Sequence, residues 1–129
     1  MIPPEYLELL AGAHTAVLVT LGPDGAPHTS PVWFLFDENA GLVRVSNVAG
    51  RQKQRNIERD PRVSFTVIDP HNSYRYLELR GTATVVDDPE CAARDAVVRK
   101  HGYRDGSGFD KPGTRRVAVT ITPNRALVH

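Results

Sequence analysis

The sequence predicts a mainly β domain (α+β class), in which about six antiparallel strands close into a small barrel with two or three short helices. The apolar residues recur mostly with a period of two, which is typical of strands. Glycine, proline, asparagine and aspartate interrupt this pattern at short and regular intervals. Closure into a barrel would hide the edges that so many strands leave exposed. An open α+β sheet is the alternative.

Length and charge restrict the classes of function. The 129 residues suit a single domain spanning 1–129. With 16 Lys and Arg against 15 Asp and Glu, the chain is too balanced for a general nucleic-acid or membrane binder. No apolar run reaches the roughly 18 residues of a membrane helix, and the N-terminus lacks the order of a secretory signal. The single cysteine offers no disulfide framework. We therefore expect a cytoplasmic protein.

Six segments carry the strand pattern, and three of them contain an interruption. Pro31 cannot donate a backbone hydrogen bond, so it indicates a sheet edge, a bulge or a break. Gly81 predicts a bulge or a sharp bend, and Pro123 could divide the last segment into two short strands. The six predicted strands are 14–21, 28–37, 42–47, 62–69, 74–86 and 115–129.

Two segments between these strands have helix punctuation. Residues 51–60 follow Gly50 and stop before a proline, which predicts a short helix. Residues 87–102 begin with Asp88 as a cap and Pro89 at the first helical position. The glycine-rich segment 103–114 is expected to be a mobile loop.

Residues 51–62, here called the basic segment, include the first of these helices and contain five cations and only two acids. A solvated helix face is the ordinary explanation. However, Arg51 and Arg55 lie at i and i+4, where like charges repel each other. The cations also stand near a helix N-terminus, which already favours an anion. Because guanidinium groups bind phosphate in a bidentate manner, the segment predicts a phosphate-bearing ligand rather than nucleic acid, whose usual motifs are absent.

Other candidate chemistry is sparse. The five histidines have no metal-ligand spacing, so no metal site is predicted. No phosphate-binding glycine motif or nucleophile elbow occurs, and we assign no catalytic side chain. Residues 69–81 could form a barrel exterior or a ligand or subunit contact. In residues 29–34, Trp33 and Phe34 are most simply core residues. If the protein is an enzyme, a cofactor would carry its chemistry.

Three motifs in this order resemble the pyridoxamine 5′-phosphate oxidase-like split-barrel superfamily, and within it the deazaflavin oxidoreductases that use coenzyme F420. The motifs are G-x-P-H-x-S-P-V-W-F (25–34), V-S-N-V-A-G-R-Q-K-Q-R-N-I-E-R-D-P-R-V-S (45–64) and D-P-x-N-x-Y-R-Y-L-E-L-R-G (69–81). The resemblance covers about residues 5 to 127. It implies a six-stranded antiparallel split barrel that forms a homodimer, with the cofactor in a groove between the subunits.

The resemblance also implies a set of cofactor-binding residues. The cofactor phosphate would be held at 51–55, by Arg51, Lys53 and Arg55 with Gln52 between them. The remaining contacts would come from the second strand, from the third strand and from the partner subunit. These are Ser30, Pro31, Val32 and Trp33 beside the ring, Ser46 and Asn47 between ring and phosphate, and Asn72, Tyr74 and Tyr76 reaching across from the partner.

The function implied is hydride transfer between coenzyme F420 and a small organic substrate. An FMN-dependent oxidoreductase on the same fold is one alternative. A non-catalytic protein that binds a cofactor or haem is another. The residues do not separate these possibilities, and the preference for the deazaflavin rests on the similarity of the motifs.

Overall fold

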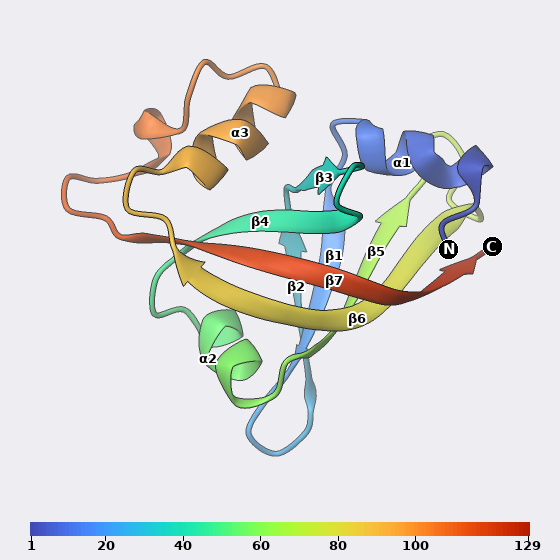
Figure 1. Cartoon of the computed structure of the whole chain (residues 1–129), viewed down its shortest axis with the longest axis horizontal. Coiled ribbons are helices and arrows are strands. Elements are labelled where there is room, and N and C mark those ends of the chain that lie inside the picture. The colour runs from blue at the N-terminus through green and yellow to red at the C-terminus, as the bar shows by residue number, and fades with distance from the viewer.

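A single curled antiparallel sheet of seven strands forms the body of the protein (Figure 1). The computed structural model describes all 129 residues. Its strands follow the spatial order β2-β1-β5-β6-β7-β4-β3. Their bounds are β1 Ala16–Leu21, β2 Pro27–Val32, β3 Leu35–Asp37, β4 Leu42–Val48, β5 Arg62–Ile68, β6 Tyr76–Asp87 and β7 Arg116–Val128, and the helices are η1 Pro4–Tyr6, α1 Leu7–Ala11, α2 Gln52–Arg59, α3 Ala92–Lys100 and η2 Ser107–Phe109.

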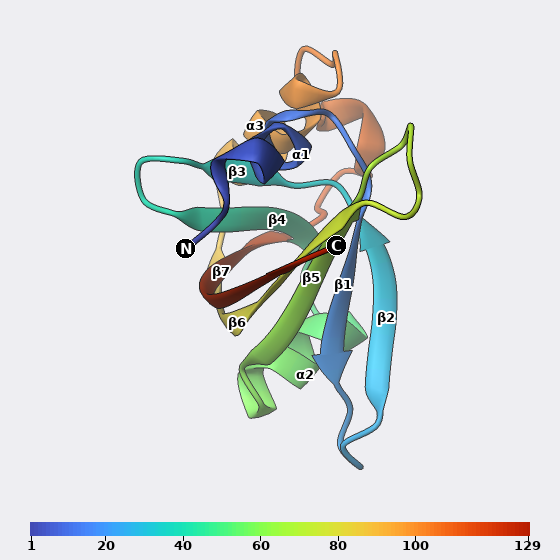
Figure 2. The same ribbon diagram turned by 90° about the vertical axis from the view of Figure 1, so that its right-hand side faces the viewer.

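The predicted strand 28–37 is two strands, which accounts for seven strands in place of six. β2 ends at Val32, and β3 begins at Leu35 and pairs with β4 instead of β1. The chain therefore changes partner at Trp33 and Phe34, and β2 and β3 become the two ends of the sheet. Pro31 lies inside β2, which pairs only with β1, so its missing N–H can face the open edge. The edge prediction for Pro31 is confirmed, and Figure 2 shows β2 outside β1 and β5.

The longest pairing, between β6 and β7, is irregular where the sequence predicts a bulge. The register shifts between Arg80 and Gly81. A Cβ on Gly81 would lie 2.1 Å from the carbonyl oxygen of Thr122, so only glycine allows this close approach of the two strands. Pro123 lies opposite Gly81 at the same irregularity. The division at Pro123 is wrong, because β7 continues through it as one strand of 13 residues.

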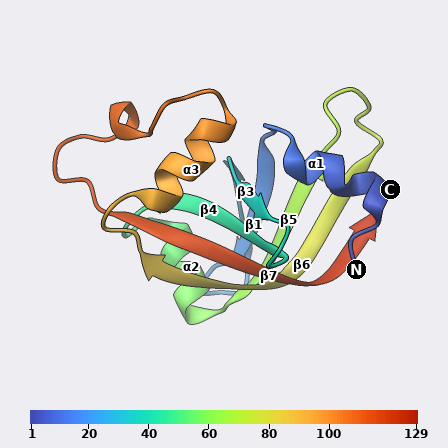
Figure 3. The same ribbon diagram turned by 45° about the horizontal axis from the view of Figure 1, so that its top comes forward.

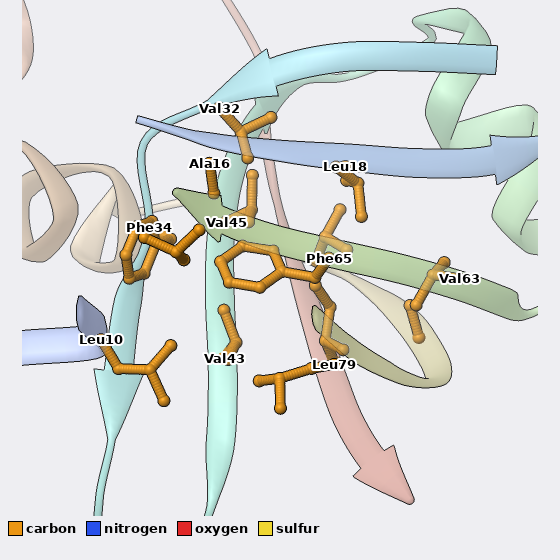
Figure 4. Packing of buried hydrophobic residues seen from close by; sticks show 14 of the residues in the cluster. Leu10, Ala16, Leu18, Val32, Phe34, Val43, Val45, Val63, Phe65 and Leu79 are labelled. Carbon is orange, nitrogen blue, oxygen red and sulfur yellow. The ribbon is translucent and has the colours of Figure 1, made fainter. Parts of the chain in front are cut away.

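The concave side of the sheet holds the hydrophobic core (Figure 4). Alternate residues of β1, β4, β5 and β6 point inward, as the period of two requires. Phe65 and Phe34 meet edge to face with ring centroids 5.0 Å apart. Both rings are completely buried. Phe34 is thus a core residue, as expected, and it fixes the point at which the chain turns from β2 into β3.

The two longer helices lie at opposite ends of the barrel. α1 and α3 are at one end and α2 is at the other (Figures 1 and 3). α2 agrees with the predicted helix 51–60. α3 starts at Ala92, so the placement of Pro89 at the first helical position is wrong. A turn closed by the Cys91 N–H to the Asp88 carbonyl delays the helix. The Asp88 carboxylate still caps it, because it accepts hydrogen bonds from the Ala93 and Arg94 N–H groups at 3.1 and 3.2 Å.

None of the helices has the length and apolar character needed to cross a membrane.

Candidate functional site

Two adjoining cavities are lined by residues of β2, β4, α2 and α3. Lys53 lines both of them. The first, here called the basic cavity, has a volume of about 290 Å³ and is lined by His28, Asn47, Arg51, Gln52 and Lys53. The second, here called the aromatic cavity, has a volume of about 220 Å³ and is lined by Pro31, Val32, Trp33, Ser46, Lys53, Arg94, Val97, Val98, Phe109 and Arg116.

The start of α2 positions the cations of the basic cavity. Gly50 has φ of +84°, in the left-handed region that favours glycine, and it turns the chain from β4 into the helix. Its N–H donates to the Gln54 side-chain oxygen at 2.8 Å. No side chain caps α2, so the N–H groups of its first turn stay available to an anion. Arg51 and Lys53 stand at this helix end.

Three of the five cations in the basic segment have other partners. Arg55 donates to the Gly50 carbonyl and to Gln52 Oε1, the latter at 2.7 Å. Arg59 donates to the Leu21 carbonyl at 2.6 Å, and Arg62 forms an ion pair with Asp60 at 2.7 Å. Arg51 and Lys53 have no ion pair. The positive charge available to a ligand is therefore concentrated on Arg51 and Lys53.

The electrostatics of Lys53 are those of a cation without a counterion. Burial lowers the pKa of its ammonium group, and the neighbouring Arg51 charge lowers that pKa further. Both causes act against the charged form in the free protein. An anion in the basic cavity would remove the unfavourable charge pairing, so the cavity has the properties of an anion site without its anion.

Two residues that line the basic cavity have a buried polar atom without a hydrogen-bond partner in the protein. These atoms are His28 Nδ1 and Asn47 Nδ2. The Ser30 hydroxyl, two residues from His28 on β2, is also buried without a partner, but Ser30 does not line the cavity. Buried polar groups in native proteins are normally paired. The two unpaired groups of the basic cavity therefore point to a polar ligand there.

The aromatic cavity takes its flat wall from Trp33, in the link between β2 and β3. The Trp33 ring stacks on His101 with ring centroids 3.8 Å apart and planes at 8°. Tyr103 and Phe109 approach it from the segment after α3, at 6.0 and 6.2 Å. Both rings are about half exposed, at 47% and 51%. The expectation that Trp33 is a core residue is wrong, because its side chain is only partly buried and lines a cavity.

Behind Trp33, Lys100 at the end of α3 fixes the same link. Its ammonium group donates to the carbonyls of Leu10 at 2.9 Å and Phe34 at 3.3 Å. It also lies 3.8 Å from the centre of the Phe34 ring. Burial lowers the pKa of Lys100 to about 8. α1, α3 and the β2–β3 link are thus joined at one group, which holds the wall of the aromatic cavity in place.

A carboxylate joins the two arginines on the polar wall of the aromatic cavity. Asp110 accepts from Arg94 Nη1 at 2.9 Å and from Arg116 Nη2 at 2.6 Å. Arg116 also approaches Ser46 Oγ at 3.4 Å. These two guanidinium groups lower the pKa of Asp110, Arg116 being the stronger cause. The 103–114 segment, expected to be a mobile loop, contains η2 and is tied to α3 and β7 by these bonds.

A third and larger cavity, of about 340 Å³, lies on β1, β5 and β6. Its two arginines, Arg62 and Arg80, are already paired with Asp60 and Glu78 at 2.7 and 2.8 Å. Its cations therefore have counterions, unlike those of the basic cavity, and it is a weaker candidate for binding an anion.

The structure brings together most of the residues that the sequence predicts for the site. Asn47, Arg51, Gln52 and Lys53 line the basic cavity, and Pro31, Val32, Trp33 and Ser46 line the aromatic cavity. Ser30 contributes a buried unpaired hydroxyl, and Arg55 lines neither cavity. The remaining three predicted residues line neither cavity. Asn72 lies before β6, Tyr74 is 81% exposed, and the Tyr76 ring stacks on His129.

Sequence reasoning missed the half of the aromatic cavity that follows β6. These residues are Arg94, Val97 and Val98 on α3, Phe109 on η2 and Arg116 at the start of β7, and His28 was missed in the basic cavity. Only His28 had a local signal, since it lies within a motif that also contains Ser30 and Pro31. The others meet through contacts between segments far apart in the chain, which no spacing in the sequence reveals.

The chain is similar to several reductases, two of which are named for coenzyme F420. It is 34% identical over 123 residues to an F420H2-dependent biliverdin reductase of Mycobacterium tuberculosis, a match covering 95% of this chain and 85% of that protein. A 5a,11a-dehydrotetracycline/5a,11a-dehydrooxytetracycline reductase of Streptomyces rimosus is 31% identical over 67% of this chain and 68% of its own length. A solved F420 reductase superposes with a TM-score of 0.82 at 34% identity, covering 98% of both chains.

A family model described as pyridoxamine 5′-phosphate oxidase matches residues 2–128. The resemblance seen in the three sequence motifs is confirmed, and so is the split-barrel fold, with seven strands in place of six. The chain therefore belongs to the pyridoxamine 5′-phosphate oxidase family.

Proposed function

We propose that this protein is an oxidoreductase that transfers a hydride between coenzyme F420 and a small organic substrate. The observation that carries the proposal is the pair of uncompensated cations, Arg51 and Lys53, at the start of α2 in a basic cavity that adjoins an aromatic one. The two relatives whose names include F420, the biliverdin reductase and the solved F420 reductase, support the choice of this cofactor over FMN.

The residues present fit a phosphate-bearing ring compound. His28 Nδ1 and Asn47 Nδ2 are buried without partners in the wall of the basic cavity. A phosphate there would meet Arg51, Lys53 and the first-turn N–H groups of α2. Arg55 as a further phosphate contact stays a prediction, because its guanidinium already bonds to Gly50 and Gln52.

The aromatic cavity would hold the ring. Trp33 offers a flat face, Pro31 and Val32 offer apolar surface, and Ser46 and Asn47 lie on β4 toward the basic cavity. The unpaired Ser30 hydroxyl on β2 is available to a polar atom of the ring. When bound, coenzyme F420 supplies the deazaflavin ring that carries the hydride.

The share of the chain in this reaction is binding and orientation. Arg51 and Lys53 hold the anionic end, while the stacked Trp33 and the apolar residues of α3 orient the reacting end. Neither cavity is lined by a carboxylate. We therefore expect solvent, rather than an acidic side chain of this chain, to exchange the proton that accompanies the hydride.

We also propose that the protein works as a homodimer in the cytoplasm. Asn72, Tyr74 and Tyr76 line neither cavity of their own subunit, and Tyr74 is 81% exposed. Tyrosine is enriched at protein–protein interfaces relative to the rest of the surface. In a dimer these residues would complete the site of the partner subunit. Sedimentation of the purified protein tests the assembly, and a monomer at all concentrations would refute it.

The cofactor assignment is tested by adding coenzyme F420 to the purified protein and following the coenzyme's fluorescence. We expect saturable binding at micromolar concentrations, and oxidation of the reduced coenzyme when a suitable acceptor is added. Absence of saturation would refute the proposal. Protein that is purified yellow, with a bound flavin, would instead favour FMN.

A further inference from the structure

The two adjoining cavities differ in charge although both contain cations. On the wall of the aromatic cavity, Arg94 pairs with Asp95 at 3.0 Å and with Asp110 at 2.9 Å. Arg116 pairs with Asp110 at 2.6 Å. The two guanidinium charges are therefore balanced by two carboxylates. In the basic cavity, Arg51 and Lys53 have no carboxylate partner.

Asp110 is the group on which this balance depends. Its side chain is only 8% exposed, and those of Arg94 and Arg116 are 13% and 14% exposed. Arg116 directs both its Nε and its Nη2 at this carboxylate. Such a two-point bond fixes the plane of the guanidinium as well as its charge. Without Asp110, Arg116 would keep only its long contact of 3.4 Å to Ser46 Oγ.

We propose that Asp110 determines the orientation in which the ligand enters, because it neutralises Arg94 and Arg116 and leaves the basic cavity as the only anion site. A phosphate-bearing ring compound then has one favourable arrangement, with its phosphate at Arg51 and Lys53 and its ring against Trp33. Asp110 lines neither cavity and acts through the two arginines, so it is a positioning residue. The consequence for orientation rests on the proposed function, whereas the charge arrangement does not.

Removal of the Asp110 charge would turn the two arginines into a second anion site. Two arginines that share a carboxylate present the same donors that bind phosphate in many proteins. If the carboxylate is replaced by a neutral amide, two partly buried guanidinium groups face a cavity with only Asp95 as a counterion. Leaving a buried charge without its partner is strongly unfavourable. A free phosphate, or the phosphate of a reversed ligand, would then bind at Arg94 and Arg116.

Inorganic phosphate is the probe that tests the proposal, since it needs no ring and no turnover. Calorimetric titration at low ionic strength counts the phosphates bound per chain. We expect a single phosphate for the wild-type chain and a second one for Asp110→Asn. The matched control is Asp105→Asn, which removes the same charge from the same segment but bonds only to Ser107. Asp105→Asn should bind a single phosphate, as the wild-type chain does, so that any binding of phosphate at Arg94 and Arg116 is at least about tenfold weaker in this control than in Asp110→Asn.

Further variants separate this effect from a loss of structure. Circular dichroism and a thermal melt establish that Asp110→Asn is folded. Combining it with Arg94→Gln should restore a single phosphate per chain, because the second site needs both arginines. A second phosphate on the wild-type chain, or an unchanged count in folded Asp110→Asn, would overturn the proposal. The wild-type count can overturn the proposal even if the variants do not fold.

With coenzyme F420, Asp110→Asn should still bind the cofactor, but kcat should fall by about tenfold, about 1.4 kcal/mol. Asp105→Asn should keep the wild-type kcat. If no variant, nor the wild type, binds coenzyme F420, the proposed function fails and the phosphate counts still decide the role of Asp110. If the cofactor binds and the counts are equal in all variants, only the role of Asp110 fails.

Discussion

Replacing Lys53 with alanine tests the phosphate site at its most distinctive residue. Lys53 lines both cavities and has no counterion. A hydrogen bond to a charged group contributes about 1.5–3 kcal/mol. Burial already lowers the pKa of Lys53 in the free protein, so much of the desolvation cost is met before the ligand arrives. We therefore expect the upper part of this range, about 2–3 kcal/mol, which corresponds to a Kd about 30- to 150-fold weaker.

Fluorescence titration of coenzyme F420 measures this loss. The control is Lys111→Ala, which removes the same charge from an exposed position that lines neither cavity. An equal Kd for Lys53→Ala, Lys111→Ala and the wild type would refute the assignment of Lys53.

The pH dependence of binding gives a second measurement of the same group. An anion beside Lys53 favours its protonated form, so binding raises the pKa of Lys53 above its lowered value in the free protein. The affinity should then fall as the pH rises through the free-protein pKa, because the site must take up a proton to bind. This fall should disappear in Lys53→Ala. A pH profile that is the same in both proteins would contradict the mechanism.

Three further predictions concern the scaffold of the site. The pKa of Lys100 is lowered from 10.5 to about 8 in the folded protein, so the unfolded chain binds more protons between these values. The free energy of unfolding should rise with pH across that window, and urea denaturation of Lys100→Met should show a smaller rise. Asp88→Ala removes the cap of α3 and should cost about 1 kcal/mol in a thermal melt, whereas the exposed Asp87→Ala should change stability by less than about 0.5 kcal/mol. Gly81→Ala, whose Cβ would meet the next strand at 2.1 Å, should destabilise by about 1–3 kcal/mol, in contrast to Gly108→Ala, where the added Cβ meets nothing within 4 Å. Equal melting temperatures within either pair would contradict these assignments.

The parts of the fold that local residues determine could be predicted from the sequence. Pro31 indicates a sheet edge because it lacks an N–H, and Gly81 indicates the bulge because the strands approach too closely there for a side chain. Pro31 also left a break open, but the position of the break could not be predicted from it. It occurs at Trp33 and Phe34, where Phe34 enters the core and β3 pairs with β4 instead of β1. That choice depends on the closure of the whole sheet.

The residues of the site also fall into those that could be predicted from neighbouring residues in the sequence and those that could not. Arg51 and Lys53 could be predicted, because Gly50, the helix start and the cations are adjacent in the chain. Neither Arg94 nor Arg116 could be predicted, because Asp110 joins them from a segment that has the composition of a loop. Long-range ion pairs follow from the packing of α3 against β4 and β7, which short motifs do not encode.

Trp33 is the only tryptophan of the chain, and its fluorescence tests most directly whether the ring and the phosphate occupy the adjoining cavities. Coenzyme F420 is titrated into the protein while tryptophan emission is recorded, with Lys53→Ala titrated in parallel. We expect saturable quenching of Trp33, with a midpoint that moves to higher cofactor concentration in Lys53→Ala. Cofactor binding that leaves the emission of Trp33 unchanged would contradict the placement of the ring, and with it the account of the site.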